Sequence, residues 1–123
     1  MAQNGANKQE LTAATDTTAG GVLSLANPEG TDLIVTRLVL DVTTASSGAA
    51  TVDAGIAADG STSADNLIDG ASVAAAGVLD NVEDGGTNGQ AVFRWDAEEF
   101  LTITASATTA GMVANAYIEY IRA

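Results

Sequence analysis

The chain has 123 residues, and its four Lys+Arg against sixteen Asp+Glu give a formal net charge of −12, with no histidine and no cysteine. The commonest general base, thiol nucleophiles and thiolate metal ligands are therefore missing, and disulfides are excluded. The acidic balance excludes nucleic acid as an expected partner, because binding to the phosphate backbone depends on Lys and Arg.

The size and apolar content predict one folded domain. Hydrophobic residues make up 46% of the chain and the mean hydropathy is +0.19, well away from disordered compositions. Only 4% of the residues are aromatic, so the core is thin and we expect a symmetric homo-oligomer, a trimer or a dimer. No run approaches the roughly 20 apolar residues of a membrane span, and the first residues lack the features of a signal peptide. We expect no membrane partner and synthesis in the cytoplasm.

Residues 1–20 predict an extended N-terminal arm ahead of a domain over residues 21–123. The segment is polar, contains one isolated Leu11 and shows no sustained period. We expect contact with another molecule to order it, through Lys8 and Leu11 as small anchors.

From Gly21 onward, turn signals recur roughly every 8 to 14 residues, a spacing typical of an all-β sandwich or barrel. The first expected strand, 21–25, precedes a type I turn at 27–30 that has Pro28 second and Gly30 fourth. The next, 32–42, is the strongest and is expected to lie centrally, since both of its faces are partly apolar. One face carries Ile34, Leu38, Leu40 and Val42 with Thr36, and the other carries Leu33, Val35, Arg37, Val39 and Asp41.

The middle of the chain alternates strands with polar loops. Residues 51–57 predict a strand with Val52, Ala54 and Ile56 inward, followed by a long polar loop to residue 66. Residues 72–80 are compatible with a weak strand or a short helical turn, and the pattern does not decide between them. A second loop rich in glycine and acidic residues covers 81–89.

Three further strands are expected at 91–95, 100–106 and 112–121, the last with Met112, Ala114, Ala116, Ile118 and Tyr120 inward. About eight strands without a long helix predict an all-β fold, a single antiparallel β-sandwich of jelly-roll or Greek-key type. The residues expected to be buried are Ile34, Leu38, Leu40, Val52, Ile56, Phe93, Leu101, Ile103 and Ile118.

The possible chemical sites each have a simpler structural interpretation. The loops at 59–66 and 80–85 carry oxygen ligands of the kind calcium prefers, but they lack EF-hand spacing and are typical of turns. The carboxylates after Trp95, at Asp96, Glu98 and Glu99, suggest a pair acting on a sugar or a hydrated turn, and the scarcity of aromatic residues favours the turn. Glycines 85, 86 and 89 lack phosphate-loop spacing. We predict no enzyme activity and no catalytic, cofactor or metal residues.

Several longer phrases resemble small proteins that decorate or cement the capsids of tailed bacteriophages. The phrases are LDVTT, VDAGIAADGSTSADNLIDG, WDAEEFLTIT and NAYIEYIR, and the resemblance covers about residues 31–122. It implies a β-sandwich subunit bound to the outer surface of a capsid in the virion, made in the host cytoplasm, with the major capsid protein as partner.

The resemblance implies a structural role, in which the protein bridges neighbouring capsomers and strengthens the head. The alternative is a binding module on the virion surface, for carbohydrate or a host surface, or the base of a head fibre. The contact residues that we predict for the capsid or a neighbouring subunit are Lys8, Leu11, Leu33, Val35, Val39 and Tyr117.

Overall fold

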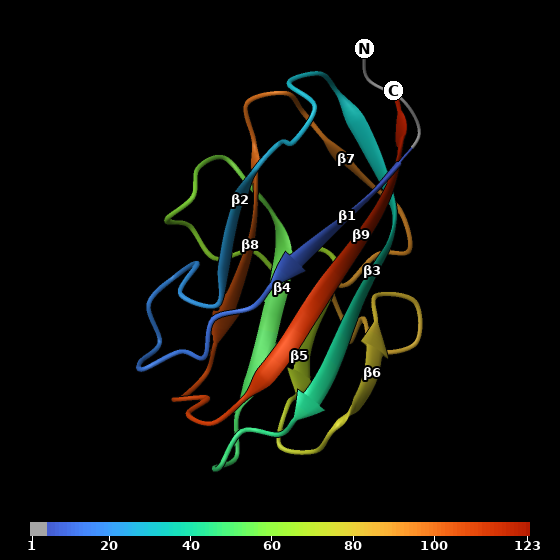
Figure 1. The fold of residues 1–123 in the computed structure, drawn as a ribbon. Coiled ribbons are helices and arrows are strands. Elements are labelled where there is room, and N and C mark those ends of the chain that lie inside the picture. The colour runs from blue at the N-terminus through green and yellow to red at the C-terminus, as the bar shows by residue number, and fades with distance from the viewer. Residues whose placement is uncertain (1–4) are drawn as a thin grey trace.

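The computed structural model describes residues 5–123, and this part of the chain consists of strands and loops without a helix (Figure 1). All strand pairs are antiparallel, so the predicted all-β sandwich is confirmed. No helix that could cross a membrane occurs among these residues. The strands are β1 (Gly5–Glu10), β2 (Leu23–Ala26), β3 (Leu33–Thr44), β4 (Thr51–Ala57), β5 (Ile68–Ser72), β6 (Gly77–Asp80), β7 (Phe93–Trp95), β8 (Phe100–Ala105) and β9 (Val113–Arg122).

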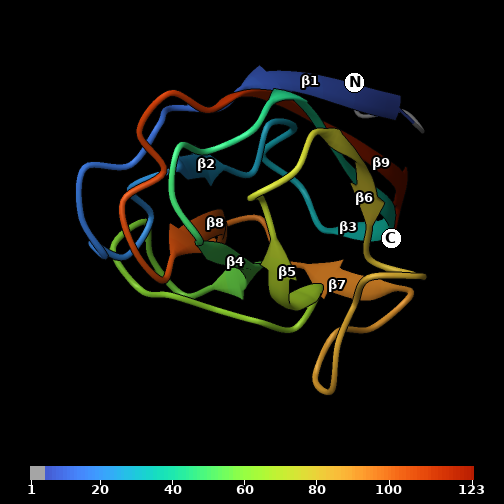
Figure 2. The same cartoon turned by 90° about the horizontal axis from the view of Figure 1, so that it is seen from below.

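Two sheets face each other (Figure 2). The five-stranded sheet has the order β1-β9-β3-β6. The short β7 pairs with the same edge of β3 as β6 does, but with the first half of β3, whereas β6 pairs with the second half. The four-stranded sheet has the order β2-β8-β4-β5. The long strands β3 and β9 lie at the centre of the larger sheet, and the two-sided apolar pattern predicted this position for β3.

The strand pairs are nested in the manner of a jelly roll. The innermost pair is β4 with β5. It is enclosed in the sequence by β3 with β6, then by β2 with β8, and finally by β1 with β9. β7 is an addition to this plan. The nesting makes β1 the first of the eight jelly-roll strands, although its sequence, GANKQE, lacks the alternation of a strand that is half buried.

The core lies between the sheets and agrees with most of the expected residues. Seven of the nine predicted core residues are buried: Leu38, Leu40, Val52, Ile56, Leu101, Ile103 and Ile118. Phe93 is partly buried and packs against the core, and Trp95 is fully buried. Ile34 is only half-buried, because it lies on the outer face of the sheet.

A β-bulge at Thr36 explains why the faces of β3 were assigned incorrectly. Val35 pairs with Tyr120 and Arg37 pairs with the next residue of β9, Glu119, so Thr36 is an extra residue. The extra residue reverses the alternation. Leu33 and Val35 therefore face the core and are fully buried, and the prediction that they need cover from another molecule is wrong.

The described part of the expected arm is bound to its own sandwich. β1 pairs along its whole length with β9 of the same chain, and the following Leu11 and Ala14 belong to the core. The prediction that Leu11 anchors the arm to another molecule is wrong, since its side chain closes one end of the core. Residues 1–4 lie outside the described residues.

Residues 72–80 resolve in favour of strands. Ser72 ends β5, and Gly77–Asp80 forms β6 at the edge of the five-stranded sheet. Residues 73–76 form the connection from one sheet to the other, and of these Val73 is buried while the three alanines are exposed. The local sequence of this short β6 segment does not favour a strand, and pairing with β3 makes it one.

Candidate functional site

Three of the six predicted contact residues come together on one surface. Lys8 of β1 lies opposite Tyr117 of β9, and Tyr117 lies opposite Val39 of β3. The Lys8 ammonium lies 5.8 Å from the centre of the Tyr117 ring, within the range of a cation–π contact. Asp80 of β6 continues the row beyond Val39. The row crosses the outer face of the five-stranded sheet from one edge to the other.

We call this outer surface the open face. It comprises the outward side chains of β1, β9, β3 and β6 with Ile34 at one end, and no described segment of the chain crosses it (Figure 2). Its most exposed apolar side chains are Val78, at 66%, Val113, at 53%, and Ile121, at 40%. The other members are Ala6, Lys8, Glu10, Ile34, Arg37, Val39, Asp41, Asp80, Asn115, Tyr117 and Glu119.

The outer face of the four-stranded sheet is covered by the chain itself, through the loop of residues 58–67. The Thr102 hydroxyl on β8 donates to the carbonyl of Thr62 at 2.8 Å, and Thr102 is fully buried. Ser24 on β2 donates to the carbonyl of Gly60 at 2.9 Å. A Cβ added to Gly55 would lie 2.8 Å from the backbone nitrogen of Asn66, so glycine allows the loop to cross β4 at this distance. The two sheets therefore differ in what they present to a partner.

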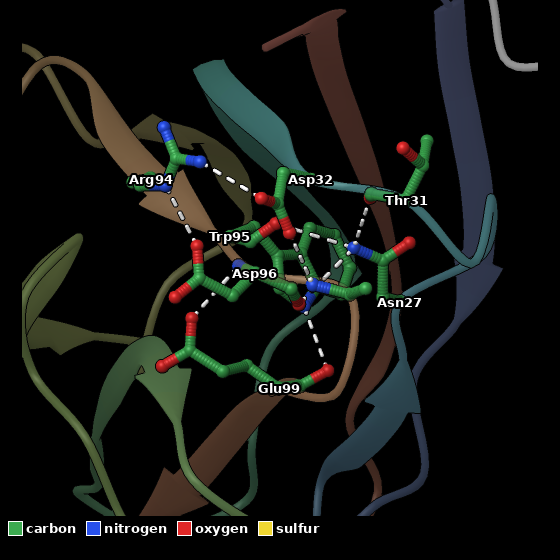
Figure 3. Close-up of polar contacts among 8 residues, drawn as sticks. Asn27, Thr31, Asp32, Arg94, Trp95, Asp96 and Glu99 are labelled. Carbon is green, nitrogen blue, oxygen red and sulfur yellow. Dashed lines mark hydrogen bonds and ion pairs between the residues drawn. The ribbon is translucent and has the colours of Figure 1, made fainter.

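Two carboxylates bind Arg94 at the end of the five-stranded sheet, one from Asp96 after Trp95 and one from Asp32 before β3 (Figure 3). Arg94 donates from Nε to Asp96 at 2.7 Å and from Nη2 to Asp32 at 2.8 Å. The second oxygen of Asp32 accepts from the backbone N–H of Ala97 at 2.9 Å. The hydrogen bond from Ala97 is the main cause of the lowered pKa of Asp32, and the bond from Arg94 adds to it. They leave an open depression of about 340 Å³ lined by Asp32, Arg94, Asp96, Ala97 and Glu98.

Further hydrogen bonds fix the turn that follows Trp95. Glu99 accepts a hydrogen bond from the backbone N–H of Asp96 at 2.8 Å, and its own carbonyl accepts from the Trp95 indole at 2.9 Å. The Asn27 side chain donates to the carbonyls of Thr31, at 2.9 Å, and Trp95, at 3.2 Å. The polar groups therefore hold the β7–β8 turn against the β2–β3 loop (Figure 3), as the turn interpretation predicts.

The acidic loops also use their carboxylates in local hydrogen bonds. Asp59 accepts from Ser61 and Thr62, and Asp80 accepts from the backbone N–H groups of Val82 and Glu83. Among residues 5–123, no group of three or more acidic side chains is placed to hold a metal ion. These loops have the geometry of Asx turns.

Asp53 carries the one carboxyl in the described chain whose pKa is clearly raised. Partial burial on β4 is the main cause, and the neighbouring charges of Asp69 and Asp65 add to it, while a hydrogen bond from the backbone of Gly70 opposes it. Asp53 and Asp69 are direct cross-strand partners. Like charges at such positions are destabilising.

The sequence analysis missed Arg37, Glu119 and Asp80 as members of the open face. Arg37 and Glu119 are cross-strand partners, and Arg37 lies 3.7 Å from Asp80. Period-two alternation through β9 correctly predicted its outward residues, but the bulge at Thr36 concealed which residues of β3 share that face. The register between strands contains this information, and single-strand patterns do not.

Comparison with known proteins does not assign a family to this architecture. No protein-family model matches the chain. No curated protein matches it with significance either.

Proposed function

We propose that this protein is a structural component of a bacteriophage virion that binds the outside of the capsid and cements neighbouring capsomers. The resemblance to capsid-decorating proteins supports this role. Its phrases fall on β3, on β4 with the loop that covers it, on the turn between β7 and β8, and on β9. These segments build the two sheets and the connections between them.

The observation that carries the proposal is the structural use of the polar side chains around Trp95. Arg94 bridges Asp32 and Asp96, and Glu99 accepts from the backbone N–H of Asp96, so these groups hold two loops together. A network of this kind makes a rigid subunit, because moving either loop breaks several charge-assisted hydrogen bonds. Rigidity suits a protein that bridges capsomers, since little conformational entropy is lost when it binds.

Cementing requires repeated modest binding more than high affinity at one site. A subunit that binds only the assembled shell stabilises it by mass action, and subunits that contact two capsomers at once add the effect of multivalency. The surface of a chain with a net charge of −12 favours a capsid partner with basic or neutral contact regions.

The experiment is a quantitative measurement of this protein in purified virions of the phage that encodes it. We expect a copy number comparable with that of the major capsid protein. Capsids from a phage with the gene deleted should bind the purified protein in a co-sedimentation assay, and bound capsids should release DNA at a higher temperature. An unrelated acidic β-sandwich protein serves as the control. Absence from virions, or a few copies per particle, would contradict the proposal.

A glycan array addresses the alternative role. Specific binding to a class of glycans, together with a copy number far below that of the capsid protein, would favour a surface-binding module. No binding to the array together with a high copy number would favour the cementing role.

A further inference from the structure

We propose that the open face is the interface with a second copy of this chain, related by a two-fold axis that runs parallel to the strands between β3 and β9. The proposal concerns the free protein and does not depend on capsid binding. It rests on the distribution of charge, on the register of the five-stranded sheet and on unused hydrogen-bonding capacity in this face.

The charge distribution restricts how two copies can approach. The open face holds Lys8 and Arg37, and Arg94 lies at its end as the cross-strand partner of Ile34. It holds only four of the sixteen acids, namely Glu10, Asp41, Asp80 and Glu119. Asp32 and Asp96 are paired with Arg94 at that end, and the remaining ten acids lie elsewhere, where Arg122 is the remaining cation. Contact through any other surface brings together mainly like charges. Their repulsion is stronger where the contact excludes water, because the local dielectric constant is lower. Among the surfaces of the molecule, the open face therefore has the lowest electrostatic cost for self-association.

The register makes the face complementary to itself. A two-fold axis between β3 and β9 places β9 of one copy over β3 of the other, and β1 over β6. In the row formed by Lys8, Tyr117, Val39 and Asp80, Lys8 then faces Asp80 of the second copy and Tyr117 faces Val39.

Two rows on one side of this row obey the same rule. Arg37 and Glu119 are cross-strand partners on either side of the axis, so each faces the opposite charge on the second copy. Ile34 and Ile121 are likewise cross-strand partners, and the axis brings them together between copies. One symmetry operation thus pairs opposite charges in two rows and apolar side chains in two rows, as an isologous interface requires. In the remaining four-strand row it places Asn115 opposite Asp41, an amide that can donate to a carboxylate, and Glu10 opposite Val78 at the rim.

Arg37 retains hydrogen-bonding capacity for this contact. Its guanidinium lies 3.7 Å from Asp80, longer than a hydrogen bond. Its Nε is buried, and within residues 5–123 it has no hydrogen-bond acceptor. A buried donor without an acceptor is costly. The Arg37 side chain as a whole is 42% exposed, so the terminal nitrogens of its guanidinium are the groups that Glu119 of the second copy would pair with.

The apolar part of the face has the composition of an interface centre. Tyr117 and Val39 lie in its middle and are half-buried, while Ile121 is 40% and Val113 is 53% exposed. Two sheets that pack face to face with aligned strands lie about 10 Å apart, so side chains of this size can interdigitate. Charged residues at the edges of the face, Lys8 and Asp80, then form a polar rim.

The test is the oligomeric state of the free protein and of two charge-reversed variants, by sedimentation equilibrium and native mass spectrometry. The wild-type chain should be dimeric at micromolar concentration. R37E and E119R should each weaken the dimer at least about tenfold, because each reversal places like charges together twice across the axis. They change the net charge in opposite directions, so a general charge effect cannot weaken both. Circular dichroism and thermal unfolding check that each variant is folded.

A mixture of the two variants makes the test specific. In a mixed dimer, both glutamates of R37E meet both arginines of E119R, so we expect dimers of one R37E and one E119R chain at close to wild-type affinity. Val82→Glu is the control for Val113→Glu, since Val82 is 52% and Val113 is 53% exposed but only Val113 lies on the open face. A wild-type monomer at about 100 µM, or variants that fail to combine, would overturn the proposal and leave the result of the capsid assay unaffected.

Discussion

At the residue scale, three asparagines tie together segments that are far apart in the sequence. Asn81 is 2% exposed, accepts from the backbone N–H of Leu38 and donates to the carbonyls of Gln90 and Ala91. It occupies the position along β3 between the pairing of β6 and that of β7. Asn27 and Asn66 bridge other loops in the same way. An amide side chain suits this position because it carries both a donor and an acceptor.

Replacing Asn81 with alanine should lower the free energy of unfolding by about 2 kcal/mol, since it leaves several buried backbone groups unpaired. Urea denaturation measures the change. Asn88→Ala removes the side-chain hydrogen bond to Asp65 at an exposed position and keeps the backbone one to Asp69. This control should cost less than about 1 kcal/mol. Equal effects at the two positions would mean that Asn81 is not a special link.

Gly55→Ala tests the close crossing of the 58–67 loop. A Cβ at this position would lie 2.5 Å from Oδ1 of Asn66, and the backbone nitrogen at 2.8 Å cannot easily move away. We expect a loss of about 1–3 kcal/mol by thermal or urea unfolding. Gly48→Ala is the matched control, because nothing lies within 4 Å of its added Cβ. A neutral Gly55→Ala would show that the loop is free to lift from the sheet.

At the element scale, β1 shows how a segment without its own strand pattern becomes part of a sheet. Its inward positions are Asn7 and Gln9, which lie opposite the buried Ile118 and Ala116. Backbone pairing with β9 and the contact of Lys8 with Tyr117 hold it. Behind it, the hydroxyl of Tyr120 donates to Glu29 at 2.7 Å, and burial raises the pKa of Tyr120 to about 12.

Leu11→Ala should therefore destabilise the free protein by about 2–3 kcal/mol, because Leu11 is 8% exposed and belongs to the core. An arm ordered only by another molecule would give no change in the free protein. Thr12→Ala, at the neighbouring exposed position, should stay within about 0.5 kcal/mol of wild type. Chemical denaturation of the isolated protein distinguishes the two cases.

At the scale of the whole molecule, the negative charge is distributed so that the acids have unequal effects on stability. Hydrogen bonds from the backbone N–H of Ser61 and from the hydroxyls of Thr62 and Ser61 lower the pKa of Asp59, so its contribution to stability is present above its ordinary pKa and is lost on acidification. The raised pKa of Asp53 has the opposite sign. The folded state is more stable when Asp53 is protonated. This stability is lost as the pH rises through the pKa of Asp53 in the folded state.

Asp53→Asn should raise the unfolding temperature at pH 7, because it removes a partly buried charge next to Asp69 and retains an oxygen for Gly70. The gain should shrink on acidification and vanish near pH 3, about one unit below the ordinary pKa of aspartate, where the carboxyl is protonated in both states. Asp59→Asn is the control and should lower the unfolding temperature at pH 7. Thermal unfolding of the three proteins across pH 3–8 measures both signs, and a destabilising Asp53→Asn at pH 7 would contradict the assignment.

Most of the sandwich was predictable because burial of one sheet face leaves a period of two in the sequence. Residues 51–57 and the inward residues of β9 followed from alternation alone, and both are confirmed. The candidate surface was only partly predictable. Lys8, Val39 and Tyr117 lie on it, whereas Leu11, Leu33 and Val35 are in the core.

Composition and alternation by themselves determined the all-β class, the chain segments of most strands and the acidic character of the surface, since each depends on residue type and local spacing. Tertiary structure decided three further properties: that β1 completes the jelly roll, that the bulge at Thr36 turns Leu33 and Val35 inward, and that one sheet is covered while the other is open. Each of these depends on the register between strands distant in the sequence. The register is set by how distant strands bury their apolar faces together and by the geometry of the turns between them. The backbone hydrogen bonds that form it are common to all residues, so the pattern of a single strand does not reveal it.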